Sequence, residues 1–155
     1  LNFGFQGARD CRMPSTNGKI SEYHAAVGLA EDDGWADKAR SLQAVIDGYR
    51  GFLGSRFYGA PDLSLSYGLL LCDTLAQADA VHEAFDRYEI GSRQWYGRGL
   101  HRQSYFSNAP TDRLEISDSL AQRLIGLPMA PDLSSADIAR VSAAVAEGLD
   151  IAATL

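Results

Sequence analysis

The spacing of apolar residues changes near residue 54, and this change limits the folds open to the chain. Before it, apolar residues recur every three or four positions from Trp35 to Leu53, which predicts an amphipathic helix that stops at Gly54. After it, the apolar run at 69–71 favours a buried strand over residues 66–72, although so short a run also fits a buried helix segment. The chain therefore has to pack helices and strands together.

Further helices and strands complete the pattern. Ser21, Thr74 and Ser134 are favourable N-cap residues, each placed before a run with helical spacing. The other expected elements are a loop at 1–20, a loop at 55–64, a strand at 92–96, a loop at 97–113, a short helix at 117–123 and a strand at 125–129, which Pro128 would place at an edge of the sheet. This order predicts the α+β class, with a short sheet backed by helices.

Composition and charge exclude several classes of function. The net charge is -6 and the pI is about 4.9, so phosphate backbones are repelled and nucleic acid is not expected as a partner. Cys11 and Cys72 have no CxxC companion, which favours a reducing, cytoplasmic setting over a disulfide framework. No apolar run approaches the roughly 20 residues that span a membrane. Because the chain starts with Leu1 rather than Met, we expect a fragment of a longer protein.

The residues alone form no self-sufficient catalytic set. His24, His82 and His101 lie far apart, and none has a second ligand four residues away, so no metal site is expected. There is no GxSxG elbow for a serine nucleophile. Composition and spacing therefore support an α+β domain and no particular chemistry.

Three stretches add a resemblance. They are NFGF at 2–5 with TNGKISEYHAA at 16–26, then RQWYGRGLHRQ at 93–103, and finally LPM at 127–129 with PDLS at 131–134. In this order and separation they resemble the C-terminal landmarks of the DegT/DnrJ/EryC1/StrS aminotransferases. The family pattern carries proline where this chain has Gly97 and Gly99.

The resemblance implies a fold-type I pyridoxal-phosphate (PLP) transferase, of which residues 1–155 would be the small C-terminal domain. Within it, 1–20 would be an active-site and interface loop, 21–54 two helices, and 55–155 a small α+β subdomain. The family's Schiff-base lysine, pyridine-binding aspartate and most of its phosphate cup precede these landmarks. Neither Lys19 nor Lys38 stands in the Schiff-base context, so no catalytic residue is expected in this chain.

The resemblance also implies a cofactor contact. The family's matching asparagine reaches the cofactor phosphate of the neighbouring subunit, and Asn17 occupies that slot, with Lys19 a weaker candidate beside it. The alternative is that Asn17 serves only as a turn residue before Gly18, and that Lys19 lies on the surface.

The candidate substrate residues come from the second stretch. The matching family segment approaches the sugar-nucleotide pocket, which suggests substrate roles for Arg93, Trp95, Tyr96 and His101. Alternatively, Arg93 pairs with a surface carboxylate and the two aromatic residues fill the core. We also expect a positive patch around His101, formed with the neighbouring arginines, where an anionic sugar nucleotide would settle.

The whole protein would then transfer an amino group from an amino acid, glutamate being the expected donor, to a nucleotide-linked keto-sugar. We expect a cytoplasmic homodimer that serves nucleotide-sugar and polysaccharide biosynthesis, while this part alone is expected to be inactive. Three alternatives stay open: a dehydratase of the same fold, an aminotransferase for a cyclitol or another ketone, and a truncated, non-catalytic interaction module.

Overall fold

The computed structural model describes residues 19–58, 67–95, 99–106 and 108–153, and divides the chain into two compact units, 1–36 and 37–155. In the first unit, helix α1 (Glu22–Asp33) begins after Ser21, whose hydroxyl accepts a hydrogen bond from the backbone N–H of His24 at 3.3 Å. Gly34 ends α1, and none of its residues is buried. The expected N-cap at Ser21 is confirmed.

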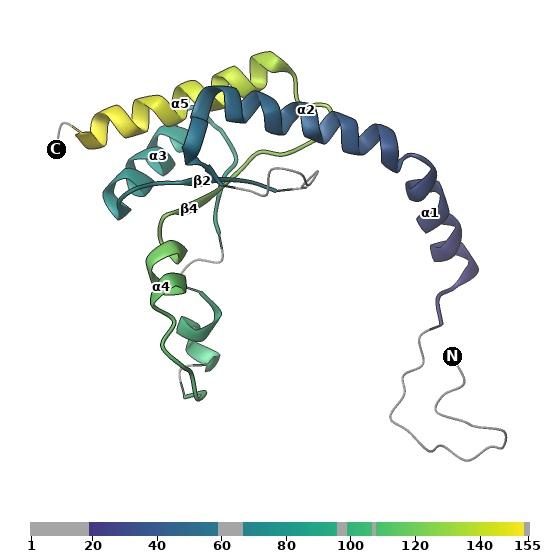
Figure 1. The fold of residues 1–155 in the computed structure, drawn as a ribbon, viewed down its shortest axis with the longest axis horizontal. Helices are drawn as coiled ribbons and strands as arrows, with labels where there is room; N and C mark the ends of the chain where they lie inside the picture. The colour runs from purple at the N-terminus through teal and green to yellow at the C-terminus, as the bar shows by residue number, and fades with distance from the viewer. Residues whose placement is uncertain (1–18, 59–66, 96–98, 107, 154–155) are drawn as a thin grey trace. The chain divides into compact units, whose positions relative to one another are not determined.

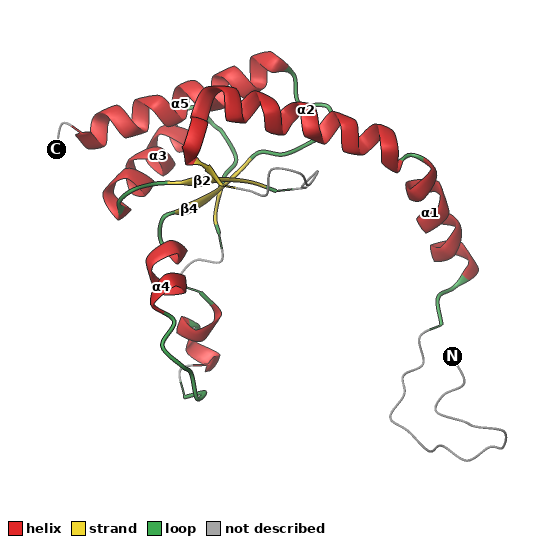
Figure 2. Cartoon of the chain, viewed as in Figure 1, coloured by secondary structure: helices red, strands yellow, loops and turns green. Residues whose placement is uncertain are grey.

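The second unit holds the sheet and its helices (Figures 1 and 2). Helix α2 (Trp35–Leu53) ends at Gly54, whose φ of +57° favours glycine. The elements that follow are β1 (Phe57–Tyr58), β2 (Gly68–Leu71), α3 (Leu75–Arg87), β3 (Arg93–Gln94), α4 (Glu115–Ala121), β4 (Leu124–Leu127) and α5 (Ser135–Ala153), with short 3-10 turns at Gly54–Arg56, Leu100–Arg102 and Ser104–Phe106. The α+β class is confirmed.

The described strands form one antiparallel sheet in the order β1-β2-β4-β3. Leu70 pairs with Ile125, and Arg93 pairs with Gly126. The prediction of an edge position for the strand at 125–129 is wrong. β4 lies between two partners, because the strand stops at Leu127 and Pro128 only follows it. The prediction of a loop at 55–64 is also wrong at its start, since Phe57 and Tyr58 pair with β2.

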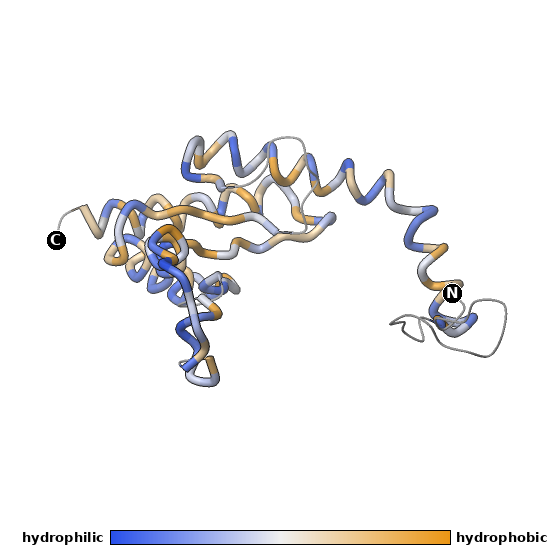
Figure 3. Tube along the Cα trace, turned by 60° about the horizontal axis from the view of Figure 1, so that its bottom comes forward, coloured by the Kyte–Doolittle hydropathy of each residue, from blue (hydrophilic) through white to orange (hydrophobic). Residues whose placement is uncertain are grey.

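The core lies where the sheet meets α2, α3 and α5. Its fully buried side chains include Tyr49, Phe85, Ile46, Leu70, Ile125, Val81 and Val145. Figure 3 shows apolar and polar residues alternating along the helices, as expected for elements with one buried face. Helices α3 and α5 cross closely at Gly148, where an added Cβ would lie 2.6 Å from the Cα of Val81.

Two N-caps fix the ends of the helices that cover the sheet. Ser134 and Asp137 form the expected capping box, since each side chain accepts the other residue's backbone N–H at 3.1 Å. Thr74 caps α3 through the N–H of Gln77 at 3.1 Å. The Gln77 side chain accepts from the backbone N–H of Asp73 at 2.9 Å, which precedes the cap residue.

In the part of the chain that the structure describes, no helix combines the length and the apolar character needed to cross a bilayer.

Candidate functional site

A hollow of about 340 Å³ lies beside β3 and contains two of the predicted substrate residues. Arg93 opens β3 and Trp95 directly follows the strand, and both side chains line this hollow. The backbone N–H of Trp95 donates to the carbonyl of Leu124 at 2.9 Å and extends the pairing with β4. The residues that line this β3 hollow are Tyr67, Gly91, Ser92, Arg93, Trp95, Gly126, Leu127 and Met129.

The chemistry of the β3 hollow is aromatic and cationic. The rings of Tyr67 and Trp95 meet edge to face, with centroids 4.8 Å apart. Trp95 is half-buried, and its indole lies beside Gly126 of β4, where an added Cβ would stand at ordinary contact distance, 3.7 Å from the ring. Arg93 is exposed, and among the described residues it forms no ion pair. An aromatic pair beside a guanidinium suits a ligand that carries both a ring and a phosphate.

A second hollow, of about 320 Å³, contains His101. The imidazole Nε2 lies 2.7 Å from Oδ1 of Asp118, which sits on α4. Arg102 holds the same carboxylate with both arms of its guanidinium, at 3.0 Å to Oδ1 and 2.8 Å to Oδ2. These bonds, that of Arg102 first and that of His101 second, hold the pKa of Asp118 well below its usual range. The carboxylate is therefore ionised at neutral pH.

This His101 hollow is not the positive patch that the sequence suggested. Asp118 neutralises Arg102, and the exposed acidic side chains of Asp112 and Glu115 also line the hollow. Arg98 lies outside the described residues. No lining residue is common to the His101 hollow and the β3 hollow, so His101 is not brought into one pocket with Arg93 and Trp95.

The remaining predicted site residues are Asn17, Tyr96 and Lys19. Asn17 and Tyr96 lie outside the described residues, so their roles stay predictions. Lys19 is exposed, as is Lys38 on α2, and neither lines one of the hollows described here. The described residues therefore offer no pocket lysine to hold PLP, and among them no cluster of His, Cys, Asp or Glu is arranged to bind a metal ion.

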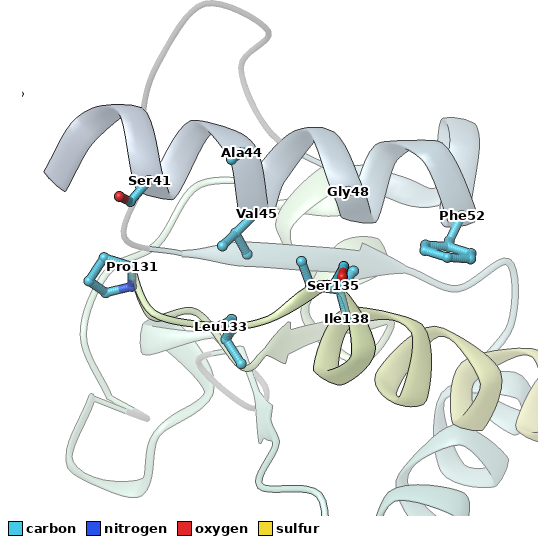
Figure 4. A pocket seen from close by; sticks show the side chains of 9 residues that line it. All are labelled: Ser41, Ala44, Val45, Gly48, Phe52, Pro131, Leu133, Ser135 and Ile138. Atoms are coloured by element: carbon cyan, nitrogen blue, oxygen red, sulfur yellow. The ribbon is translucent and has the colours of Figure 1, made fainter. Parts of the chain in front are cut away.

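A third hollow, of about 320 Å³, was not indicated by any motif. Figure 4 shows it between α2 and the segment that enters α5, with Phe52 at one end. Phe52 is 61% exposed although it belongs to an amphipathic helix. The lining residues are uncharged: Ser41, Ala44, Val45, Gly48, Phe52, Pro131, Leu133, Ser135 and Ile138.

Sequence reasoning also missed Asp118, the residue that anchors His101. It stands 17 positions from His101 in a short helix, and no local spacing connects the two. The two residues meet only in the folded chain, so no pattern in the sequence pointed to Asp118 as the partner of His101.

Comparisons with known proteins agree with this fold. Residues 2–146 match the model of the DegT/DnrJ/EryC1/StrS aminotransferase family. Protein Rv3402c of Mycobacterium tuberculosis is 32% identical over 155 residues, which cover 94% of this chain and 37% of that protein. The chain therefore spans under half the length of this relative.

Two solved structures show the same fold. A protein from Bacillus cereus, described as a PLP-dependent aminotransferase, superposes with a TM-score of 0.82 at 24% identity, over 94% of this chain and 42% of its own. DesI, solved with its TDP-sugar product, gives 0.77 at 23% identity, over 99% of this chain and 43% of its own.

Proposed function

Because the chain belongs to the DegT/DnrJ/EryC1/StrS aminotransferase family, whose members depend on PLP, we propose that it is the C-terminal part of an enzyme that aminates a nucleotide-linked keto-sugar. The bound cofactor would supply the electron sink that amino transfer needs. Glutamate is the proposed amino donor. The presence of a TDP-sugar in DesI, which shares the fold, supports the choice of substrate class.

In this proposal the cofactor's lysine belongs to another part of the protein. The chain spans 37% of Rv3402c, which leaves room for such a part, and its own lysines stand outside the described hollows. Asn17 would donate to the cofactor phosphate of a neighbouring subunit in a homodimer, with Lys19 nearby. The 155 residues would therefore be inactive alone.

The observation that carries the proposal is the β3 hollow. A nucleotide-linked sugar presents flat rings and a diphosphate, and the hollow presents Trp95 against Tyr67 with Arg93 beside them. Aromatic side chains stack on bases and sugars, and a guanidinium binds phosphate oxygens in pairs. Tyr96 directly follows Trp95 and is proposed to act with it.

Measuring the two half-reactions separately tests this assignment. In the full-length enzyme, Arg93→Ala should weaken the keto-sugar half-reaction by about 10- to 100-fold in kcat/KM, the effect of losing a hydrogen bond to a charged group. The glutamate half-reaction should be unchanged, because the donor lacks the nucleotide. Arg40→Ala is the matched control, since Arg40 is an exposed arginine on α2 bonded to Asp37. Equal damage to both half-reactions, or none, would contradict the assignment of Arg93.

A cofactor titration tests the role of Asn17. Asn17→Ala should weaken PLP binding by about 1–3 kcal/mol, because a charged phosphate loses one donor. The measurement is an absorbance titration of the full-length apoenzyme. An unchanged affinity would assign Asn17 to the turn with Gly18 alone.

A further inference from the structure

At Gly99 the backbone of the segment that leads into His101 adopts a conformation that proline, the residue of the family pattern, could not adopt. Its φ is +84°, in the region that favours glycine. The family pattern places proline at this position, and the proline ring holds φ near -65°. A Cβ on Gly99 would also lie 2.9 Å from Cε1 and 3.2 Å from Nδ1 of His101. The imidazole therefore rests against bare backbone that only glycine provides.

The opposite edge of the ring is held by Asp118. A carboxylate accepts hydrogen bonds and has none to donate, so the Nε2 of His101 carries the hydrogen in the 2.7 Å bond. Arg102 donates a hydrogen bond to each oxygen of Asp118 and thereby fixes the orientation of the carboxylate. The His101 side chain is only 12% exposed. In the neutral ring, Nδ1 is then the nitrogen that accepts a bond.

The charges around the His101 hollow indicate what Nδ1 would accept from. Arg102 is engaged by Asp118, and Arg113 lies within 3.9 Å of Glu115 with 93% of its side chain exposed. The acidic side chains that line the hollow are Asp112, Glu115 and Asp118, and they outnumber the arginines there, Arg102 and Arg113. A phosphate would be repelled here, whereas a neutral hydroxyl group finds an acceptor.

We propose that Asp118 is a positioning residue which, with Gly99, fixes His101 so that Nδ1 accepts a hydrogen bond from a sugar hydroxyl. The identity of the sugar-bearing ligand rests on the function proposed above, but the positioning does not. In this arrangement the phosphate-bearing part of the ligand lies elsewhere, which agrees with the separation of the His101 hollow from the β3 hollow.

Nuclear magnetic resonance on the full-length protein tests the positioning directly. With ¹⁵N-labelled histidine, the Nε2–H proton of His101 should appear as a resolved downfield signal, because Asp118 slows its exchange with water. His101→Gln identifies the signal. Asp118→Ala and Gly99→Pro should each abolish it, whereas Asp112→Ala, which removes another acid from the same hollow, should leave it in place. Survival of the signal in Asp118→Ala would overturn the proposal, whether or not the enzyme transfers amino groups.

A titration tests the ligand. TDP-glucose should shift the His101 ring signals while TDP alone does not, and Asp118→Ala should weaken TDP-glucose binding roughly three- to tenfold. Asp86→Ala, which removes an exposed acid on α3 outside this hollow, should bind it normally. Equal shifts with TDP and TDP-glucose would show that His101 contacts the nucleotide or the phosphate. The absence of any shift with TDP-glucose would show that no sugar reaches Nδ1. Either result overturns the hydroxyl assignment, and the half-reaction assay independently decides whether the protein is an aminotransferase.

Discussion

Replacing Gly148 with alanine should destabilise the fold, although alanine is the better helix former. Gly148 lies on α5 where that helix crosses α3. The new Cβ would stand 2.6 Å from the Cα of Val81 and 2.9 Å from the carbonyl oxygen of Ala80. Both are backbone atoms, so no side chain can rotate to relieve the overlap.

The magnitude follows from two opposing effects. Carbon atoms in contact prefer about 3.5–4.0 Å, so the two helices must separate locally by about 1 Å. Overpacking of this kind costs typically about 1–3 kcal/mol, and occasionally more. The higher helix propensity of alanine returns about 1 kcal/mol. Because backbone meets backbone, we place the packing cost at the upper end and expect a net loss of about 2 kcal/mol, or about 4–8 °C in Tm for a chain of this size.

Gly51→Ala in α2 is the matched control, because no atom lies within 4 Å of its added Cβ. It should raise the free energy of unfolding by about 0.5–1 kcal/mol through propensity alone. Urea denaturation followed by circular dichroism measures both variants, and the midpoints are comparable if the m-value is unchanged. A Gly148→Ala protein as stable as the Gly51→Ala protein would refute the close crossing of α3 and α5.

Three further predictions concern buried and capping groups. Tyr49→Phe should cost about 1–3 kcal/mol by thermal unfolding, because its hydroxyl donates to the carbonyl of Pro128 at 3.0 Å and this partly buried acceptor would lose its donor. Burial also raises the pKa of Tyr49 to about 12, so wild-type stability should fall between pH 10 and 12; a difference from Tyr49→Phe that stays constant across that window would contradict it. Burial raises the pKa of the Cys72 thiol to about 11, so iodoacetamide at pH 8 should leave Cys72 unmodified in the folded protein. Mass spectrometry locates the modified residues, and modification of Cys72 as fast as in the unfolded protein would contradict its burial. Ser134→Ala should cost about 1 kcal/mol in urea at neutral pH, because the Asp137 N–H loses its acceptor and the Asp137 carboxylate loses the Ser134 hydroxyl. The Ser134 bonds lower the pKa of Asp137, so the carboxylate part of this cost is present above pH 4 and should be lost as the pH falls further, while the N-cap bond remains; an equal cost at pH 2 would count against it.

Local patterns predicted the helices well and the sheet order poorly. The bounds of α2 were correct, because its apolar period runs without interruption to Gly54, where a positive φ stops it. The order of the strands depends on pairings between distant residues, such as Leu70 with Ile125, and apolar spacing carries no information on partners. Pro128 was therefore taken as a sign of an edge strand when it only follows the end of a central one.

The candidate site was predictable where residues share an element. The motif at 93–103 pointed to Arg93 and Trp95, and both line one hollow, because Trp95 directly follows the strand that begins with Arg93. It also pointed to His101, but not to Asp118, because a bond across 17 positions requires the loop to fold back onto α4. The positive patch predicted around His101 is not found among the described residues for the same reason, since the carboxylate that neutralises Arg102 comes from that helix.

The central position of β4 also sets an order of events during synthesis. β2 and β3 emerge from the ribosome before β4, yet among the described strands β3 pairs only with β4, which comes roughly 30 residues later. At a translation rate of about 5–20 residues per second, this leaves β3 without its partner for about 1.5–6 s. During that interval the edge of β2 that later receives β4 is open to other chains. A nascent chain stalled before Leu124 should therefore be the form of this protein that aggregates most readily or engages chaperones.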